Sequence, residues 1–198
     1  MKSFFERYSF YSFRMLIDQV AIAIFGLVLS MATNKFPTLR LICTIGAILF
    51  YLFLLYLVGW EIGSKDRMSA DLGKITYRPV TGLLVSLLAN SINILFALFV
   101  TCGLVLNVYV LGRIGAVGAL LGEGMYTGLL ALKIGETPLN EFWFMYFIII
   151  LPALLISTVS YILGYHNVMF TGLMKPQYPA SDRPGKKDKE NENREGKQ

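Results

Sequence analysis

Long apolar segments alternate with short charged segments along this chain. Four of the apolar segments, at about 15–33, 41–60, 80–106 and 142–164, run for roughly twenty residues with at most one charge each. A helix rises about 1.5 Å per residue, so about twenty apolar residues cross a hydrocarbon core of about 30 Å. The pattern predicts an all-α integral membrane protein with a bundle of four transmembrane helices.

Polar and aromatic residues indicate what lies between these spans. The first fourteen residues mix aromatic and basic side chains, which predicts a cytosolic segment in the headgroup region, and Arg14 is spaced to pair with Asp18. Residues 61–79 hold four Lys and Arg residues and predict a cytosolic loop. The transmembrane domain covers residues 15–174, and residues 175–198 predict a disordered, charged cytosolic tail because almost none of them can be buried.

The last span carries its own start signal and a predicted kink. Thr137 and Pro138 fit the N-cap and the first helical residue, and Pro152 should bend the helix.

The first span has a second interpretation as a cleaved signal peptide. A basic start, an apolar stretch over residues 20–29 and a small-residue site at 30–32 resemble the three regions of a leader. In that case the mature chain begins at Thr33 and lacks the first span. Sequencing of the native amino terminus distinguishes the two interpretations.

The segment 114–132 decides between four and five spans. It is long enough to cross a membrane, but it holds Glu123 at its midpoint. Four spans with the amino terminus inside place fourteen Lys and Arg residues in the cytosol against four outside, whereas five spans separate them at best ten against eight. Without the tail, the counts are seven against four for four spans and eight against three for five. The tail therefore favours four spans with both termini cytosolic, and five spans remain the alternative.

The same segment is rich in glycine. Gly118 and Gly122, and then Gly124 and Gly128, each stand four residues apart, which allows helix backbones to approach closely, so all four are candidate helix-packing residues. A re-entrant hairpin entering from outside would place Glu123 near its turn, where the carboxylate could meet a cation or a proton. An interfacial helix with Glu123 in water is the alternative.

A polar stripe on the third span gives a second candidate site. Ser86, Asn90 and Asn93 are spaced so that they share one helical face, with Thr101 further along. Lipid cannot satisfy amide groups, so this face should point into the bundle. The stripe either forms interhelical hydrogen bonds, worth about 0.6–2 kcal/mol each, or lines a solute path together with Glu123.

Composition agrees with a membrane protein and excludes several other classes. The hydrophobic fraction is 55% and the mean hydropathy is +0.57, above the usual values for water-soluble domains. The net charge is +5, but the basic residues flank apolar segments and form no aromatic-interleaved patch, so no nucleic-acid partner is expected. Cys43, Cys102 and the single histidine, His166, form no metal-binding or catalytic motif, so we expect no cofactor, metal or catalytic residue.

These features suggest two functions of different classes. The first is a non-enzymatic membrane subunit or accessory protein, indicated by the close-packing glycines and the charged cytosolic loop and tail. The second is a small transporter or channel component for an ion or a small solute, indicated by the asparagines and Glu123. The expected partners are the lipid bilayer and a membrane protein or a second copy of the chain. In its alternation of apolar and charged segments the chain resembles small multi-pass bacterial proteins of the cell membrane. No motif identifies a family.

Overall fold

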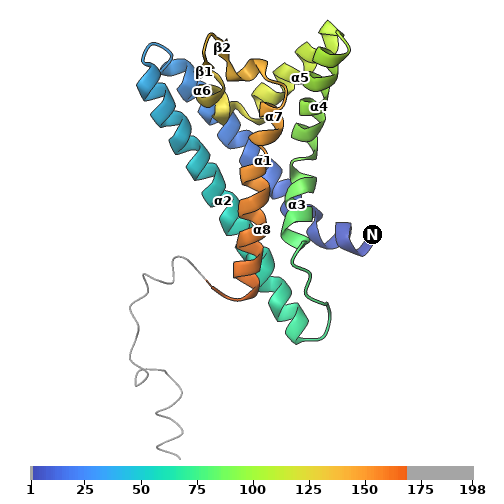
Figure 1. Ribbon diagram of the computed structural model, residues 1–198. Helices are drawn as coiled ribbons and strands as arrows, with labels where there is room; N and C mark the ends of the chain where they lie inside the picture. The colour runs from blue at the N-terminus through green and yellow to red at the C-terminus, as the bar shows by residue number, and fades with distance from the viewer. Residues whose placement is uncertain (1, 169–198) are drawn as a thin grey trace, which may run out of the picture. The chain divides into compact units, whose positions relative to one another are not determined.

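The computed structural model describes residues 2–168, and the predicted tail at 175–198 lies outside the described residues. The described chain is predominantly α-helical (Figure 1). Its helices are α1 (Lys2–Ala32), α2 (Pro37–Asp71), α3 (Thr81–Ala89), α4 (Ser91–Val105), α5 (Tyr109–Gly122), α6 (Thr127–Leu130), α7 (Met145–Ile148) and α8 (Leu151–Tyr165). Two short 3-10 helices, η1 (Gly124–Tyr126) and η2 (Leu139–Glu141), and an antiparallel hairpin of β1 (Lys133–Ile134) and β2 (Thr137–Pro138) lie between α5 and α7 along the chain.

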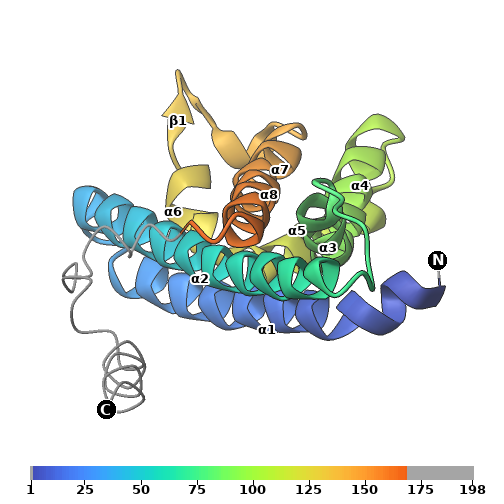
Figure 2. The same cartoon turned by 90° about the horizontal axis from the view of Figure 1, so that it is seen from below.

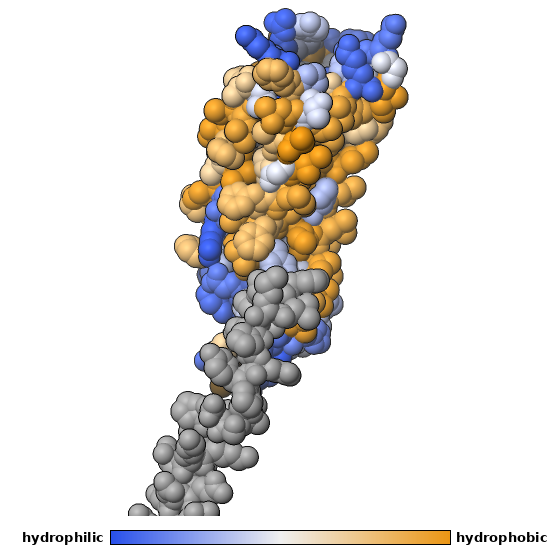
Figure 3. Space-filling model, turned by 90° about the vertical axis from the view of Figure 1, so that its left-hand side faces the viewer, coloured by the Kyte–Doolittle hydropathy of each residue, from blue (hydrophilic) through white to orange (hydrophobic). Residues whose placement is uncertain are grey.

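Three helices of residues 2–168 are long and apolar enough to cross a membrane. They are Phe4–Ala32 of α1, the whole of α2, and Met145–Tyr165, which joins α7 and α8. The pair α3 and α4 makes a fourth if its two bent halves count as one span. Figure 3 shows apolar side chains covering the middle of one face and hydrophilic side chains gathered toward its two ends. A protein that crosses a bilayer needs apolar side chains in the hydrocarbon core and hydrophilic side chains at the two membrane surfaces. This distribution and the apolar helices indicate a membrane protein.

The first helix is continuous from Lys2 to Ala32, whereas the sequence suggested a separate segment over residues 1–14. Neither proline nor glycine interrupts residues 2–25. Tyr8, Ser12 and Met15 are buried against the neighbouring helices. Tertiary packing therefore extends the helix of the first span through its polar amino-terminal turns.

Arg14 forms its ion pair with another helix. Its guanidinium lies 2.9 Å from the carboxylate of Glu61 on α2, instead of pairing with Asp18 as the sequence suggested. Glu61 also pairs with Lys65 one turn later, at 2.6 Å. The antiparallel contact between α1 and α2 brings these charges together, which spacing along one helix could not reveal (Figure 2).

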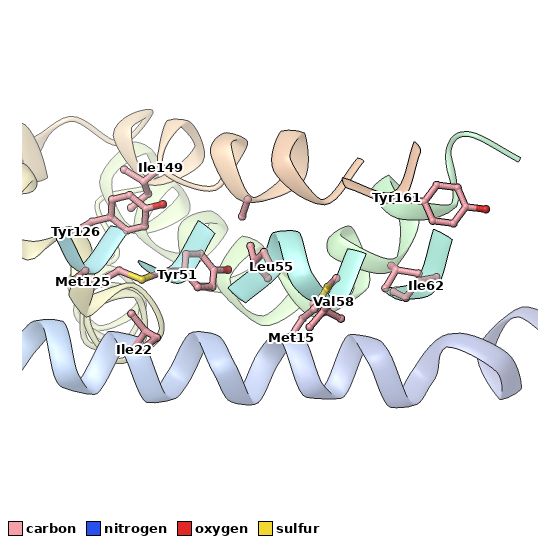
Figure 4. Close-up of a cluster of buried hydrophobic side chains, with 14 of the residues drawn as sticks. Met15, Ile22, Tyr51, Leu55, Val58, Ile62, Met125, Tyr126, Ile149 and Tyr161 are labelled. Atoms are coloured by element: carbon pink, nitrogen blue, oxygen red, sulfur yellow. The ribbon is translucent and has the colours of Figure 1, made fainter. Parts of the chain in front are cut away.

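The main apolar core lies where α1, α2, α3 and α8 meet. Figure 4 shows its side chains along the length of the contact, with Met125 and Tyr126 of η1 toward one end and Tyr161 toward the other. The labelled members come from four elements, α1, α2, η1 and α8, and from the segment before α8: Met15, Ile22, Tyr51, Leu55, Val58, Ile62, Met125, Tyr126, Ile149 and Tyr161.

Helices α2 and α8 run parallel and pack backbone to backbone. Gly59 faces Ser160 and Gly63 faces Tyr165, so both sequences advance in the same direction along the contact. A Cβ atom at Gly63 would overlap the backbone oxygen of Tyr161. Only glycine allows such an approach, so these positions set the distance between the two helices.

The third apolar segment is broken at Asn90, whereas the sequence suggested one tilted span over 80–106. α3 and α4 meet there at an angle of 60°. The Ser86 carbonyl accepts both the backbone N–H and the side-chain amide of Asn90, each at 2.9 Å. α4 then ends at a turn through Asn107, whose φ is 53°, near the exit that the sequence indicated.

The last span begins later than its apparent start signal. Thr137 and Pro138 belong to β2 and pair with Ile134 and Lys133, so they do not cap a helix. Gly135, with a φ of 67°, makes the tight turn of this hairpin. α7 begins at Met145, and Pro152 lies in the first turn of α8, where its missing N–H costs nothing and the helix is interrupted just before it.

Candidate functional site

The polar stripe of the third segment points into the protein. Ser86, Asn90 and Asn93 are buried, with 0%, 1% and 3% of their surface exposed. The Ser86 hydroxyl donates to the backbone oxygen of Ala153 on α8 at 3.3 Å. Asn93 donates to the Asn90 side-chain oxygen at 3.5 Å, so the stripe forms a chain of weak hydrogen bonds along the broken helix.

Helices α4 and α5 form a closely packed antiparallel hairpin. Gly118 of α5 packs on the Phe96 ring, and Gly122 packs on the Asn93 side-chain oxygen. A Cβ atom at either glycine would overlap those side chains. This pairing places Gly122, at the end of α5, against Asn93 of the polar stripe.

The chain leaves helical geometry immediately after Gly122. Glu123 takes an irregular conformation with φ −130° and ψ 23°, and η1 begins at the next residue. A Cβ atom at Gly124 would lie 2.5 Å from the backbone oxygen of Ala23 on α1, and Gly128 packs on Thr44 of α2. The glycine-rich segment thus threads between α1 and α2 instead of forming one straight helix.

Glu123 is buried at this break. Only 4% of the residue is exposed, and its side chain has no hydrogen bond or ion pair with any residue in the range 2–168. The hydroxyl groups of Tyr51 and Tyr126 lie within electrostatic range of the Glu123 carboxyl group. Both hydroxyls are buried without a hydrogen-bond partner in the described chain. The Tyr51 hydroxyl also lies beside the Asn90 amide but outside hydrogen-bond geometry.

A cavity of about 330 Å³ opens onto this carboxyl group. Its polar lining consists of Arg40, Glu123, Thr127, Asn140 and Tyr146, and apolar residues of α5 and α6 complete the wall. This volume lies at the lower end of the range of about 300–1,000 Å³ for small-molecule sites. The cavity therefore has room for a small solute beside an acidic group.

Arg40 brings a positive charge to the same cavity. Its guanidinium donates to the Ser30 hydroxyl at 2.7 Å, to the Asn34 side-chain oxygen at 3.2 Å and to the Thr127 backbone oxygen at 3.4 Å. Within the described ranges it has no carboxylate partner. Glu123 and Arg40 thus line one cavity without forming an ion pair with each other.

The structure brings only part of the predicted site together. Glu123 lines the cavity, whereas Ser86, Asn90 and Asn93 do not, although Asn93 lies against the adjacent Gly122. Four polar residues of the lining were not predicted from the sequence: Arg40, Thr127, Asn140 and Tyr146. Arg40 is the charged one, and in the sequence it is only one basic residue of a short loop.

The chemistry available is ion or solute binding. A carboxyl group this buried and without a protein partner is costly as an anion, so a bound proton or cation would stabilise it. Among the described residues, no group of three or more His, Cys, Asp or Glu side chains could hold a metal ion. No family model, curated protein or solved structure matches the chain.

Proposed function

We propose that this chain is a small transporter or channel component of the cell membrane, which binds an ion or a small polar solute at Glu123. The single observation that carries the proposal is the buried, unpaired Glu123 carboxyl at the wall of a cavity. Ionisable residues at membrane depth are rare because they are expensive, and they mark ion and solute pathways. Irregular backbone such as that at Glu123 is tolerated there where it lines a cavity.

The proposed topology has four spans, with α3 and α4 as one bent span and both termini in the cytosol. α5 has 14 residues and so reaches about 21 Å, too short to cross a core of about 30 Å. The turns at 33–36, near Asn107 and at 133–138 lie toward one end of the helices in Figure 1, which we assign to the outside. In this topology α5, η1 and α6 form a re-entrant segment that dips in from outside.

The two unpaired charges indicate the class of ligand. A solute with a positive group would meet Glu123, and a negative group on the same solute would meet the Arg40 guanidinium, which binds carboxylates in bidentate geometry. A small zwitterion satisfies both charges at once. A simple cation or a proton satisfies only Glu123.

An accessory role is the other function that the sequence suggested. Its support was a set of close-packing glycines together with a charged cytosolic loop and tail. Gly118, Gly122, Gly124 and Gly128 instead pack against Phe96, Asn93, Ala23 and Thr44 of the same chain. This packing uses the glycines within the chain, so they no longer indicate a partner helix, and the buried Glu123 at the cavity favours transport.

Flux through liposomes tests the proposal. The purified protein is reconstituted, and uptake of a zwitterionic amino acid, a monovalent cation and protons is measured separately. We expect uptake of at least one of them by the unaltered protein. Glu123→Gln should reduce it to the level of protein-free liposomes, because the amide keeps the shape of the side chain but cannot carry the charge.

Glu136→Gln is the matched control. Glu136 lies at the exposed turn of the β1–β2 hairpin, outside the cavity, so its replacement should leave uptake unchanged. Uptake by Glu123→Gln equal to that of the unaltered protein would reject Glu123 as the site. Absence of flux with all three probes would reject transport by this chain alone.

A further inference from the structure

A second pocket lies at the opposite end of α1 and α2 and shares no lining residue with the Glu123 cavity. Its volume is about 420 Å³, and it lies between the amino-terminal part of α1 and the carboxyl-terminal part of α2. In the proposed topology this end faces the cytosol. Neither the sequence motifs nor the proposed transport site explains why a pocket should form there.

The pocket presents mainly hydrogen-bond donors. Arg7, Lys65 and Lys74 line it with three positive charges, and Asp66 is its only acidic lining residue. Tyr11 accepts a hydrogen bond from the Lys65 amine at 2.9 Å, which leaves the hydroxyl proton of Tyr11 free to donate.

The negative charge of Asp66 is already used within the protein. Its carboxylate lies 3.1 Å from the Arg7 guanidinium and accepts hydrogen bonds from the hydroxyls of Tyr8 at 2.7 Å and Tyr161 at 3.0 Å. The Asp66 side chain is only 3% exposed, whereas that of Arg7 is 34% exposed. The acid is therefore turned inward and the cation outward, so a visiting group meets positive charge.

Lys65 and Lys74 add to this charge. The Lys65 side chain is 56% exposed and shares its charge with Glu61, which does not line the pocket. Lys74 is exposed and has no ion pair in the described part of the chain. Net positive charge with several free donors is the environment that a phosphate group requires.

The remaining lining is apolar and exposed. Met68 and Leu72 have 66% and 69% of their surface exposed beside these cations, and Ile62 closes the pocket from within. A free phosphate ion gains nothing from exposed methionine and leucine. A phospholipid places a phosphate and an acyl chain side by side, so it satisfies both kinds of lining.

We propose that this pocket binds the phosphate headgroup of an anionic phospholipid of the cytosolic leaflet. The inference depends on the proposed orientation but not on transport at Glu123. Basic pockets between helices on the cytosolic side hold anionic headgroups by the same combination of charge and apolar contact. Bound lipid would hold the amino-terminal part of α1 against α2.

Native mass spectrometry of the full-length protein in detergent tests this inference, with phosphatidylglycerol and phosphatidylcholine titrated separately. We expect phosphatidylglycerol to bind more tightly. The double variant Lys65→Gln/Lys74→Gln should weaken its binding by about 30-fold, because both basic side chains contribute to holding an anionic headgroup. This variant keeps Arg7 and Asp66, so the ion pair that joins α1 to α2 at this pocket is retained.

Arg67→Gln/Arg78→Gln is the matched control. It removes the same charge from exposed positions of the same region that do not line the pocket, so binding should be unchanged. Equal affinity for the two lipids, or an equal loss in both double variants, would overturn the proposal. Displacement of the lipid by millimolar inorganic phosphate would show that the pocket takes a soluble phosphate, which would overturn the assignment to lipid.

Discussion

Asp66 shows how far the role of one residue can depend on distant partners. In the sequence it is one of several charges in a polar segment after the second span. In the structure it is 2% exposed and joins three helices, with partners that lie 58 and 95 residues away at Tyr8 and Tyr161. A buried carboxylate is stable only when it is paired and hydrogen-bonded, and Asp66 meets both conditions.

Replacing Asp66 with asparagine should lower the thermal stability of the protein in detergent. The change leaves Arg7 without its ion pair, and we expect a loss of about 2 kcal/mol or more in the free energy of unfolding. Tyr8→Phe removes one hydrogen bond to Asp66 and should cost about 1 kcal/mol. The measurement is thermal unfolding followed by circular dichroism.

Glu61→Gln is the comparison for this series. Glu61 also forms two ion pairs, but its side chain is 34% exposed, so its loss should change stability by less than about 1 kcal/mol. A larger loss for Glu61→Gln than for Asp66→Asn would show that burial is not what makes Asp66 important.

Glycine pairing between helices operates at the scale of whole elements. Spacing in the sequence singled out Gly118, Gly122, Gly124 and Gly128, and the structure places each against a neighbouring segment. Gly59 and Gly63 have the same spacing and were not predicted as packing residues, although both lie in the contact between α2 and α8. A glycine shows that close approach is possible, but only the partner helix determines where the approach occurs.

Gly63→Ala should destabilise the protein, because the new methyl group would overlap the backbone of α8, which cannot move aside as a flexible side chain can. We expect a loss of about 1–3 kcal/mol, measured as a lower midpoint of thermal unfolding in detergent.

Gly46→Ala is the matched change on the same helix. Nothing lies within 4 Å of a Cβ atom at Gly46, and alanine is the better helix former, so stability should stay the same or rise slightly. Equal losses for the two variants would mean that α2 and α8 are not in backbone contact.

The distribution of charge over the whole molecule sets its expected orientation in the membrane. Seven Lys and Arg residues of the described chain lie toward the proposed cytosolic side and four toward the outside, when four spans are counted. The glycine-rich segment does not form one helix, and its longest helix, α5, is shorter than the three clear spans. The described chain therefore has three clear spans, or four if α3 and α4 count as one, and the topology proposed above uses the count of four.

Chemical labelling of single cysteines distinguishes the two topologies. In a background with Cys43 and Cys102 replaced by alanine, Lys133→Cys should react with a membrane-impermeant maleimide on intact cells. Lys74→Cys should react only after lysis, because four spans place the two exposed positions on opposite sides. A fifth span would place both on one side, so identical labelling of the two variants would contradict the proposed topology.

The sequence by itself indicated that lipid surrounds the chain and gave the approximate positions of the apolar helices. The reason is that the length of an uninterrupted apolar segment is a local property, and this length must match the thickness of the bilayer. It also identified Glu123 as unusual, because a single charged residue in an apolar segment can be recognised from the sequence without knowledge of its contacts. Only the tertiary structure decided where helices break and which polar groups meet: the bend at Asn90, the cavity that joins Glu123 to Arg40, and the contact of Asp66 with Arg7. These features depend on contacts between residues far apart in the chain, whose energies no single segment contains.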